Sequence, residues 1–280
     1  MLRTARLCWT LSVLFTLGLA APAAAQESPE AQGAPPESDA ASMEARMKAA
    51  RIEAVKNTTG FQMALSVNGG LGAGFVYKEG TSRTGQLENL KITDAAKASL
   101  PVILEVGYRV TPHLYGGAYG SYEEVFTKRN PLSCPENFDC ATWQWRFGVE
   151  ARYHFALGMF DPWVGLGVGM EFLKSRVKGD ISVPVAGVGA VPGKLETHVT
   201  DRGPTFARLS FGGDFRLGRY VAAGPAFTAS VGSYTVRTGT QTVTLSVPNT
   251  EPIESQVSAV KDGFHATFTM GVRFVWLPFF

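Results

Sequence analysis

Eight segments of this 280-residue chain alternate apolar residues with polar or small ones at a period of two. Successive side chains of a β-strand point to opposite faces, so each segment predicts a strand with one apolar face. The apolar runs are about 9–11 residues or longer, which is the length of a tilted strand that crosses a bilayer. The phase is unsettled only in the third segment; the segments are residues 61–75, 100–110, 114–126, 142–155, 163–172, 205–217, 221–232 and 267–280.

Alternation alone also fits a soluble β-sandwich, but two further features favour a membrane barrel. The connections alternate in length: 111–113, 156–162 and 218–220 are short, whereas 78–98, 127–140, 176–203 and 238–262 are long. Aromatic residues gather at strand ends, as they do at bilayer interfaces: Tyr108, Trp143, Trp145, Phe160, Trp163, Trp276, Phe279 and Phe280. Only a closed barrel satisfies every backbone group in lipid. We therefore predict an all-β fold, an eight-stranded antiparallel transmembrane β-barrel.

Two shorter alternating stretches leave a ten-stranded barrel as the alternative. They are ISVPVA at 181–186 and TQTVTLSV at 240–247, and the second is too short to span a bilayer. We expect both to extend hairpins above the membrane.

The segment before the barrel predicts export and a linker. Arg3 and Arg6 precede an apolar stretch, and small residues lead to Gln26, so residues 1–25 read as a secretory signal peptide, with an uncleaved anchor helix as the alternative. Residues 26–58 are rich in Ala, Pro, Glu and Ser, which predicts a disordered periplasmic extension with one helix near 43–56. That helix is either a solvated linker or a docking element. The barrel domain is predicted at 59–280, and the net charge of +2 argues for no nucleic-acid partner.

The chain ends in GVRFVWLPFF, a strand whose apolar face carries Val272, Phe274, Trp276 and Phe280. Pro278 removes a backbone donor, which a strand tolerates only near its end. With the alternating segments, this ending resembles the small outer-membrane β-barrel family of the OmpA-domain, OmpX and OmpW type, over residues 59–280. The resemblance implies an assembly signal at Phe274, Trp276 and Phe280 that the barrel-assembly machinery reads.

The resemblance and the even strand number imply a topology and partners. We expect the protein in a Gram-negative outer membrane, with both termini periplasmic and the four long loops outside. Its partners would be outer-membrane lipid, including lipopolysaccharide, and the assembly machinery, and we expect a monomer.

The polar face of the alternating strands predicts an ion-pair network inside the barrel. An eight-stranded barrel is only wide enough for side chains, and buried charges must be paired. A selectivity ring or anion path is the alternative. Glycines 165, 167 and 169 leave volume in the lumen that larger side chains must fill. The predicted lumen set is Glu105, Arg109, Arg146, Glu150, Arg152, Glu171, Arg208, Asp214, Arg216 and Arg273.

Two cysteines remain after the signal peptide, and five residues separate them in the segment NPLSCPENFDC. Because an exported chain crosses an oxidising compartment, we predict a disulfide between Cys134 and Cys140. Two free thiols or a metal pair are the alternatives, although further metal ligands are missing nearby.

These features predict a structural or surface-interaction role through the outer loops, with a narrow OmpW-type channel for small solutes as the alternative. Some barrels of this superfamily modify lipid A with His and Ser or Asp. Here His265 has only Thr267 near it, and both face inward by parity, so we expect no enzymatic activity. The sequence shows no metal cluster or nucleotide fingerprint, and GLGAG at 70–74 is a glycine-rich strand; we expect no cofactor.

Overall fold

The computed structural model describes residues 42–46 and 59–277, except 82–86, 156–157, 186–188, 219, 248–249 and 259. The predicted signal peptide, most of the predicted extension and the terminal Phe280 lie outside these residues. Residues 42–46 form one helical turn. The chain divides into two units, Met1–Glu44 and Ala45–Phe280, and the barrel belongs to the second. Within the described residues, no helix is long and apolar enough to cross a membrane.

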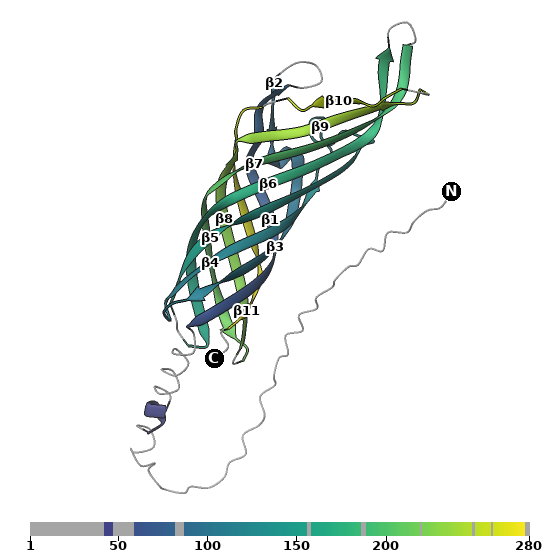
Figure 1. Ribbon diagram of the computed structural model, residues 1–280. Coiled ribbons are helices and arrows are strands. Elements are labelled where there is room, and N and C mark those ends of the chain that lie inside the picture. Colours follow the sequence, from purple (N-terminus) through teal and green to yellow (C-terminus); the bar gives the residue numbers. More distant parts are fainter. Residues whose placement is uncertain are drawn as a thin grey trace, which may run out of the picture. The chain divides into compact units, whose positions relative to one another are not determined.

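Eight antiparallel strands close a ring, which confirms the predicted fold (Figure 1). Around the ring they follow one another along the chain, and β8 closes it by pairing with both β7 and β11. Backbone pairing therefore leaves no open edge in the ring, which is the condition for crossing lipid. The strands are β1 (Gly60–Thr81), β3 (Ala96–Arg109), β4 (Leu114–Thr127), β5 (Asp139–His154), β6 (Phe160–Val185), β7 (Gly189–Arg216), β8 (Val221–Tyr234) and β11 (Gly263–Trp276).

Three short strands and one short helix lie outside the ring. The strand β2 (Leu87–Lys91) pairs with the end of β1, and α2 (Ile92–Ala95) follows it. The strand β9 (Val236–Leu245) pairs with the first part of β7, and β10 (Ile253–Gln256) pairs with β9. Residues 240–245 thus extend the sheet beyond the ring, and the described strands do not form the alternative ten-stranded barrel.

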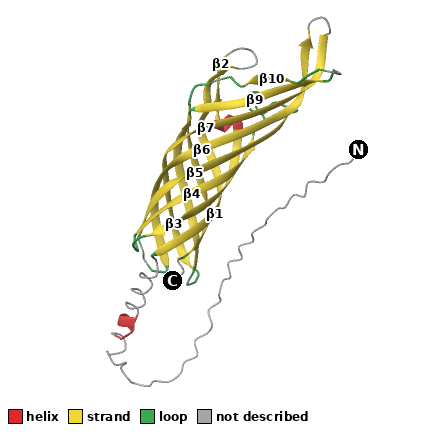
Figure 2. Cartoon of the chain, viewed as in Figure 1, coloured by secondary structure: helices red, strands yellow, loops and turns green. Residues whose placement is uncertain are grey.

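The segment 176–203 was predicted as a long connection with a hairpin extension at 181–186, and the structure confirms the hairpin but makes it longer. The strands β6 and β7 stay paired as far as Val185 and Gly189, so this segment is a β-hairpin that extends well beyond the ring (Figure 2). Its outward positions are mostly charged rather than apolar, and for this reason the search for apolar alternation found only the part at 181–186. The predicted loops at 78–98 and 238–262 likewise contain β2, α2, β9 and β10.

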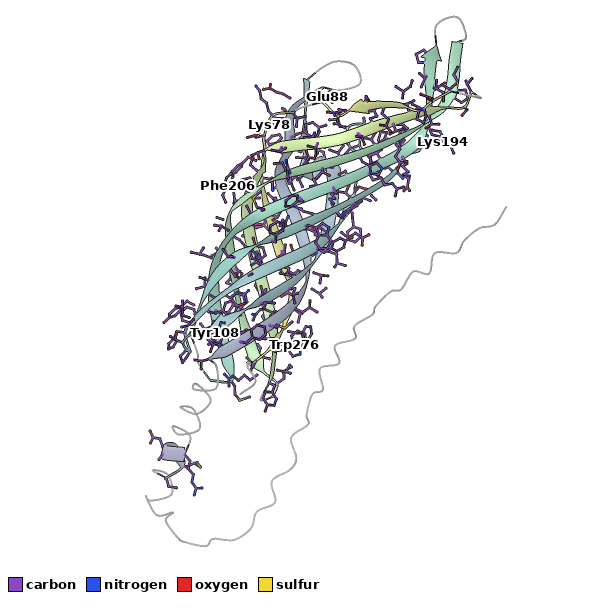
Figure 3. All side chains as sticks on the ribbon, in the orientation of Figure 1. Lys78, Glu88, Tyr108, Lys194, Phe206 and Trp276 are labelled. Carbon is purple, nitrogen blue, oxygen red and sulfur yellow. A yellow bond between two sulfur atoms is a disulfide. The ribbon has the colours of Figure 1, made fainter. Side chains whose placement is uncertain are left out.

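The two ends of the barrel differ. We call the end with the β6–β7 extension the hairpin end, and the end with the short connections the turn end. Gly60 and Trp276, the first and last residues of the ring, lie at the turn end, and Tyr108 and Trp276 mark it in Figure 3. Lys78 and Glu88 mark the hairpin end (Figure 3).

The outside of the ring is apolar and exposed, whereas its inside is polar and buried. Leu71, Leu166 and Met270 each expose more than 60% of their surface, while Gln62, Glu105 and other inward polar residues expose less than 4%. This arrangement inverts that of a water-soluble protein, in which apolar side chains are buried. A closed ring with an apolar outer surface and a polar interior is the architecture of outer-membrane β-barrels.

Cys134 and Cys140 are joined by a disulfide in the segment between β4 and β5, with an S–S distance of 2.07 Å. The Arg129 guanidinium donates to the Cys134 Sγ at 3.3 Å and to the carbonyl oxygen of Phe138. The bond therefore closes a short loop at the hairpin end that is also held by hydrogen bonds.

Leu166→Arg tests whether the apolar outer face meets lipid. Leu166 is 65% exposed at the middle of the apolar part of β6, so an arginine there should destabilise the folded barrel by about 2–4 kcal/mol in a bilayer. Urea unfolding in lipid vesicles, followed by tryptophan fluorescence, measures this change. Thr244→Arg, at an exposed position of β9 beyond the ring, is the matched control and should change stability by less than about 0.5 kcal/mol. Equal effects of the two substitutions would contradict a lipid-facing Leu166.

Candidate functional site

The barrel interior holds nearly all of the predicted charged residues. Nine of the ten predicted lumen residues are at most 7% exposed. Arg216, at the end of β7, is only half-buried, and no ion pair joins it to a carboxylate in the part of the chain that the structure describes. The other nine fall into three groups along the barrel.

The central group consists of three carboxylates and three arginines. Glu105 lies 2.8 Å from the Arg273 guanidinium and also contacts Arg152. Glu150 contacts both Arg152 and Arg208, and Arg208 lies 3.7 Å from Glu105. Asp214 accepts from Arg273 at 2.5 Å. These six side chains come from β3, β5, β7 and β11, so their charge-balanced network crosses the lumen from wall to wall.

Aromatic rings fill the space around the central arginines. The Arg152 guanidinium lies 4.5 Å from the Trp163 ring centroid, and Arg273 lies 5.1 Å from the same ring. Arg208 lies 4.2 Å from the Tyr119 ring. A cation above an aromatic face is attracted by the ring quadrupole, and the ring also excludes water from the pair. The prediction that Trp163 belongs to the interfacial aromatic belt is therefore wrong: it is 3% exposed and lies in the lumen.

The lumen glycines accommodate these large side chains. A Cβ on Gly169 would lie 2.6 Å from the Tyr119 hydroxyl, and one on Gly165 would lie 2.7 Å from Arg152 Cγ. The volume that the glycines leave is thus occupied by neighbouring side chains, and it does not form an open path.

A second group lies at the turn end. Arg109 donates to Asp161 at 2.7 Å and to the carbonyl oxygen of Pro112 at 3.1 Å. His154 Nδ1 is 3.1 Å from the same Asp161 carboxylate. Arg109 and His154 are at most 1% exposed, so this group closes the lumen behind the central one.

The third group lies on the other side of the central one, toward the hairpin end. Arg146 contacts Glu123 at 2.8 Å and Glu171 at 3.3 Å. His265 Nε2 is 2.8 Å from Glu171, and its ring stacks on Tyr234 with centroids 4.2 Å apart. Gln144 donates to Glu171 at 3.0 Å and to the Tyr234 hydroxyl at 2.9 Å. This group forms a hydrogen-bonded floor beneath the hairpin end.

His265 and Thr267 do not form a catalytic pair. The His265 ring contacts Glu171, whereas the Thr267 hydroxyl lies 2.6 Å from the Ser230 hydroxyl. Among the described residues, no group of three or more His, Cys, Asp or Glu is arranged to hold a metal ion.

A cavity of about 680 Å³ lies above this floor, inside the hairpin end. Its base includes Glu123, Gln144 and Tyr234 from the third group. Polar and charged side chains also line its walls, among them Lys97 and the ion pair between Arg237 and Asp201. The larger apolar and aromatic side chains of the walls are Val76, Tyr77, Leu90, Ile92, Val125, Leu132, Leu173, Val177, Leu195 and Val199. The helix α2 and the segment that holds the disulfide contribute to the lining. We call this space the cup.

Below the floor lies a small void of about 20 Å³, bordered by Tyr119, Arg146 and Arg208 among others. A space of this size holds about one water molecule. The cup is therefore separated from the turn end by three layers of paired side chains.

Sequence reasoning missed several lumen residues. Glu123, Tyr115 and Tyr119 lie on β4, where glycines and tyrosines on both faces hide the phase of the alternation. Asp161 precedes the apolar run of β6 and was placed in a short connection. Glu123, which is buried against Arg146, could not fix the parity of β4, because Glu124 follows it and one of two adjacent carboxylates faces outward in either phase.

Comparisons with known proteins do not give the chain a family. No family model matches, and no curated protein matches in sequence. The chain is similar to the crystal structure of Neisserial surface protein A, with 12% identity, a TM-score of 0.40, and coverage of 79% of this chain and 97% of that one. It is also similar to the outer-membrane protein OprG of Pseudomonas aeruginosa (10%, TM-score 0.41, coverage 79% and 96%) and to the outer-membrane protein AlkL (10%, TM-score 0.38, coverage 91% and 98%).

Glu105→Gln tests the central group. Glu105 contacts three arginines, so neutralising it leaves buried positive charge without compensation and should lower the free energy of unfolding by about 3–5 kcal/mol. Glu79→Gln removes the same charge from an exposed pair with Lys261 and should cost at most about 1 kcal/mol. Urea titration of both variants in the same vesicles makes the comparison. A Glu105 variant as stable as the Glu79 variant would show that the network does not depend on this carboxylate.

Proposed function

We propose that the protein is an outer-membrane barrel that acts at the cell surface and does not conduct ions. In this proposal the hairpin end faces outward and the turn end faces the periplasm. The short connections and both ends of the ring at the turn end support this orientation, because outer-membrane barrels have short periplasmic turns and longer outer segments. The predicted signal peptide supports export. The role involves no catalysis, and the barrel acts as a monomer.

The observation that carries the proposal is the division of the lumen into a closed part and a cup. Three layers of paired charges fill the ring, and opening a path through them would separate buried ion pairs at a cost of several kcal/mol. The cup has the volume of a small-molecule site, about 300–1,000 Å³. A wall that combines large apolar side chains with polar ones suits a small, partly apolar molecule that carries hydrogen-bonding groups.

The alternative function is a narrow channel for small solutes. The cup favours it as an entrance, and the floor groups Glu123, Gln144 and Tyr234 would then be the first barrier that a solute meets. The two functions differ in what happens below the floor: a surface-binding barrel keeps the ion-pair layers closed, whereas a channel opens them.

Planar-bilayer recording distinguishes them. We expect the purified, refolded protein to give no stable conductance steps, because an ion would have to separate buried ion pairs in each of the three layers. Incorporation is checked by protease protection, and a porin reconstituted in parallel is the positive control. Reproducible steps of porin size would overturn the closed lumen and favour the channel.

A cup-filling variant tests ligand binding. Ser175 lines the cup from β6 and lies 3.3 Å from the Thr142 hydroxyl, so Ser175→Trp places a large ring in the cup. We expect saturable binding of N-phenyl-1-naphthylamine, an apolar aromatic amine, to weaken about tenfold or more, a loss of about 1.4 kcal/mol. Thr242→Trp on β9, whose residue does not line the cup, is the control and should bind as the parent does. Binding is measured by fluorescence in nanodiscs, with empty discs as the background. Equal binding by both variants would exclude the cup as the site.

A further inference from the structure

A cluster of cations lies on the outer surface of β6 and β7, just beyond the apolar part of the ring. Outward side chains on β6 are apolar as far as Phe172, and Lys174 follows. On β7, which runs the other way, Phe206 is 53% exposed and Arg202 is the first outward charge beyond it. The boundary between apolar and charged surface therefore carries a cation on both neighbouring strands.

The register brings these cations together. Phe172 lies opposite Arg202 and Lys174 opposite Thr200, so Lys174 and Arg202 are diagonal neighbours on one face. Diagonal positions on antiparallel strands are about 7–8 Å apart, which a single phosphate group can bridge with two long side chains. Arg176 is the next outward residue on β6. We call Lys174, Arg176 and Arg202 the boundary site.

The boundary site has excess positive charge. Within the described residues, no ion pair joins Lys174 or Arg202 to a carboxylate. Glu196 contacts Lys178 at 2.6 Å and His198 at 2.8 Å but reaches Arg176 only at 3.4 Å. Hydrogen bonds from Lys178 and His198 hold the pKa of Glu196 at about 2, so this carboxylate is ionised at neutral pH. Glu196 therefore compensates side chains farther from the ring and leaves Lys174 and Arg202 without a compensating negative charge.

The other neighbours of the site are aromatic. Trp143 on β5 lies opposite Lys174, and Trp145 lies opposite Phe172. Trp145 also packs edge-on against Tyr122, with ring centroids 4.9 Å apart. Aromatic rings at this position occupy the interface between acyl chains and headgroups. A ligand at the boundary site would thus meet cations at its polar end and rings beside its apolar end. Two outward carboxylates lie near the site: Asp139 on β5 is opposite Lys178 and so a diagonal neighbour of Arg176, and Glu124 on β4 is opposite Trp143, two strands from Lys174.

We propose that the boundary site binds the phosphate group of an acylated glycolipid in the outer leaflet, the chemistry of lipid A. Lys174 and Arg202 hold the phosphate, Arg176 and the Thr200 hydroxyl add hydrogen bonds, and the acyl chains lie against the apolar outer surface of the ring. The position of the site explains why a lipid is favoured over a soluble phosphate: the cations stand at the edge of the surface that contacts the bilayer. This inference uses the outward orientation of the hairpin end but does not depend on what the cup binds.

Native mass spectrometry of the purified protein in detergent, titrated with bisphosphorylated lipid A, tests the proposal. We expect Lys174→Gln with Arg202→Gln to weaken binding about 30-fold, since each Lys or Arg near a charged membrane surface contributes about 1 kcal/mol. The matched control, Lys91→Gln with Lys194→Gln, removes the same charge at exposed positions away from the boundary and should keep the affinity of the parent. Heat-modifiable mobility on gels verifies that both variants fold.

Two further ligands identify the source of the phosphate. Lipid A without phosphate groups should bind the parent about as weakly as bisphosphorylated lipid A binds the double variant. Inorganic phosphate at equal concentration should not displace bound lipid A. The proposal is overturned if the double variant binds lipid A as the parent does, if the control variant loses as much affinity, or if inorganic phosphate competes as well as the lipid. Loss of this binding would leave the bilayer recordings and the cup measurements unaffected.

Discussion

Backbone closure is the constraint on which the rest of the structure depends. Every peptide group that faces lipid must be hydrogen-bonded within the protein, and β8 meets this condition by pairing with β7 on one side and β11 on the other. Closure fixes which side chains face inward, and with eight strands it also fixes how little room they have. The inward arginines and carboxylates are then held so close that pairing is the only state in which they can be buried. The apolar outer surface and the charged interior are two results of the same closed ring.

Much of this could be predicted from the sequence, because alternation reports directly which face a residue occupies. Parity predicted an inward position for residues as far apart in the chain as Glu105 and Arg273, which lie 2.8 Å apart in the structure. Parity fails where small residues occupy both faces, and β4 shows this: the inward positions of Tyr119 and Glu123 cannot be read from a strand that contains Gly116, Gly117 and Gly120. With the phase of β4 unknown, Glu123 cannot be assigned to the lumen, although it is one of the two carboxylates that contact Arg146 in the third group.

Other features could not be read from alternation at all. Partner choice within the lumen depends on stagger between strands, which no single strand encodes, so the contact of Asp161 with Arg109 and His154 emerges only in three dimensions. The hairpin extension was predicted only at 181–186, and its full length was missed because its outward positions are charged or polar, so the outward apolar face on which the prediction rests ends at Phe172. The cup could not be predicted for the same two reasons. It lies beyond the ion-pair layers, where more of the inward residues are apolar and fewer are charged.

The pairing pattern also has a consequence for the order in which the chain can fold. The β6–β7 hairpin brings together residues that are near neighbours in the sequence, up to Val185 and Gly189. The β1–β11 pairing joins residues as distant as Met63 and Trp276, 213 positions apart. The entropic cost of closing a chain segment rises with its length, and contacts between distant residues slow folding. Nucleating the β6–β7 ladder, the longest one described, thus has the lowest entropic cost. Pairing β1 with β11 has the highest. In a chain with this topology, the β6–β7 hairpin forms before the pairing of β1 with β11 closes the barrel.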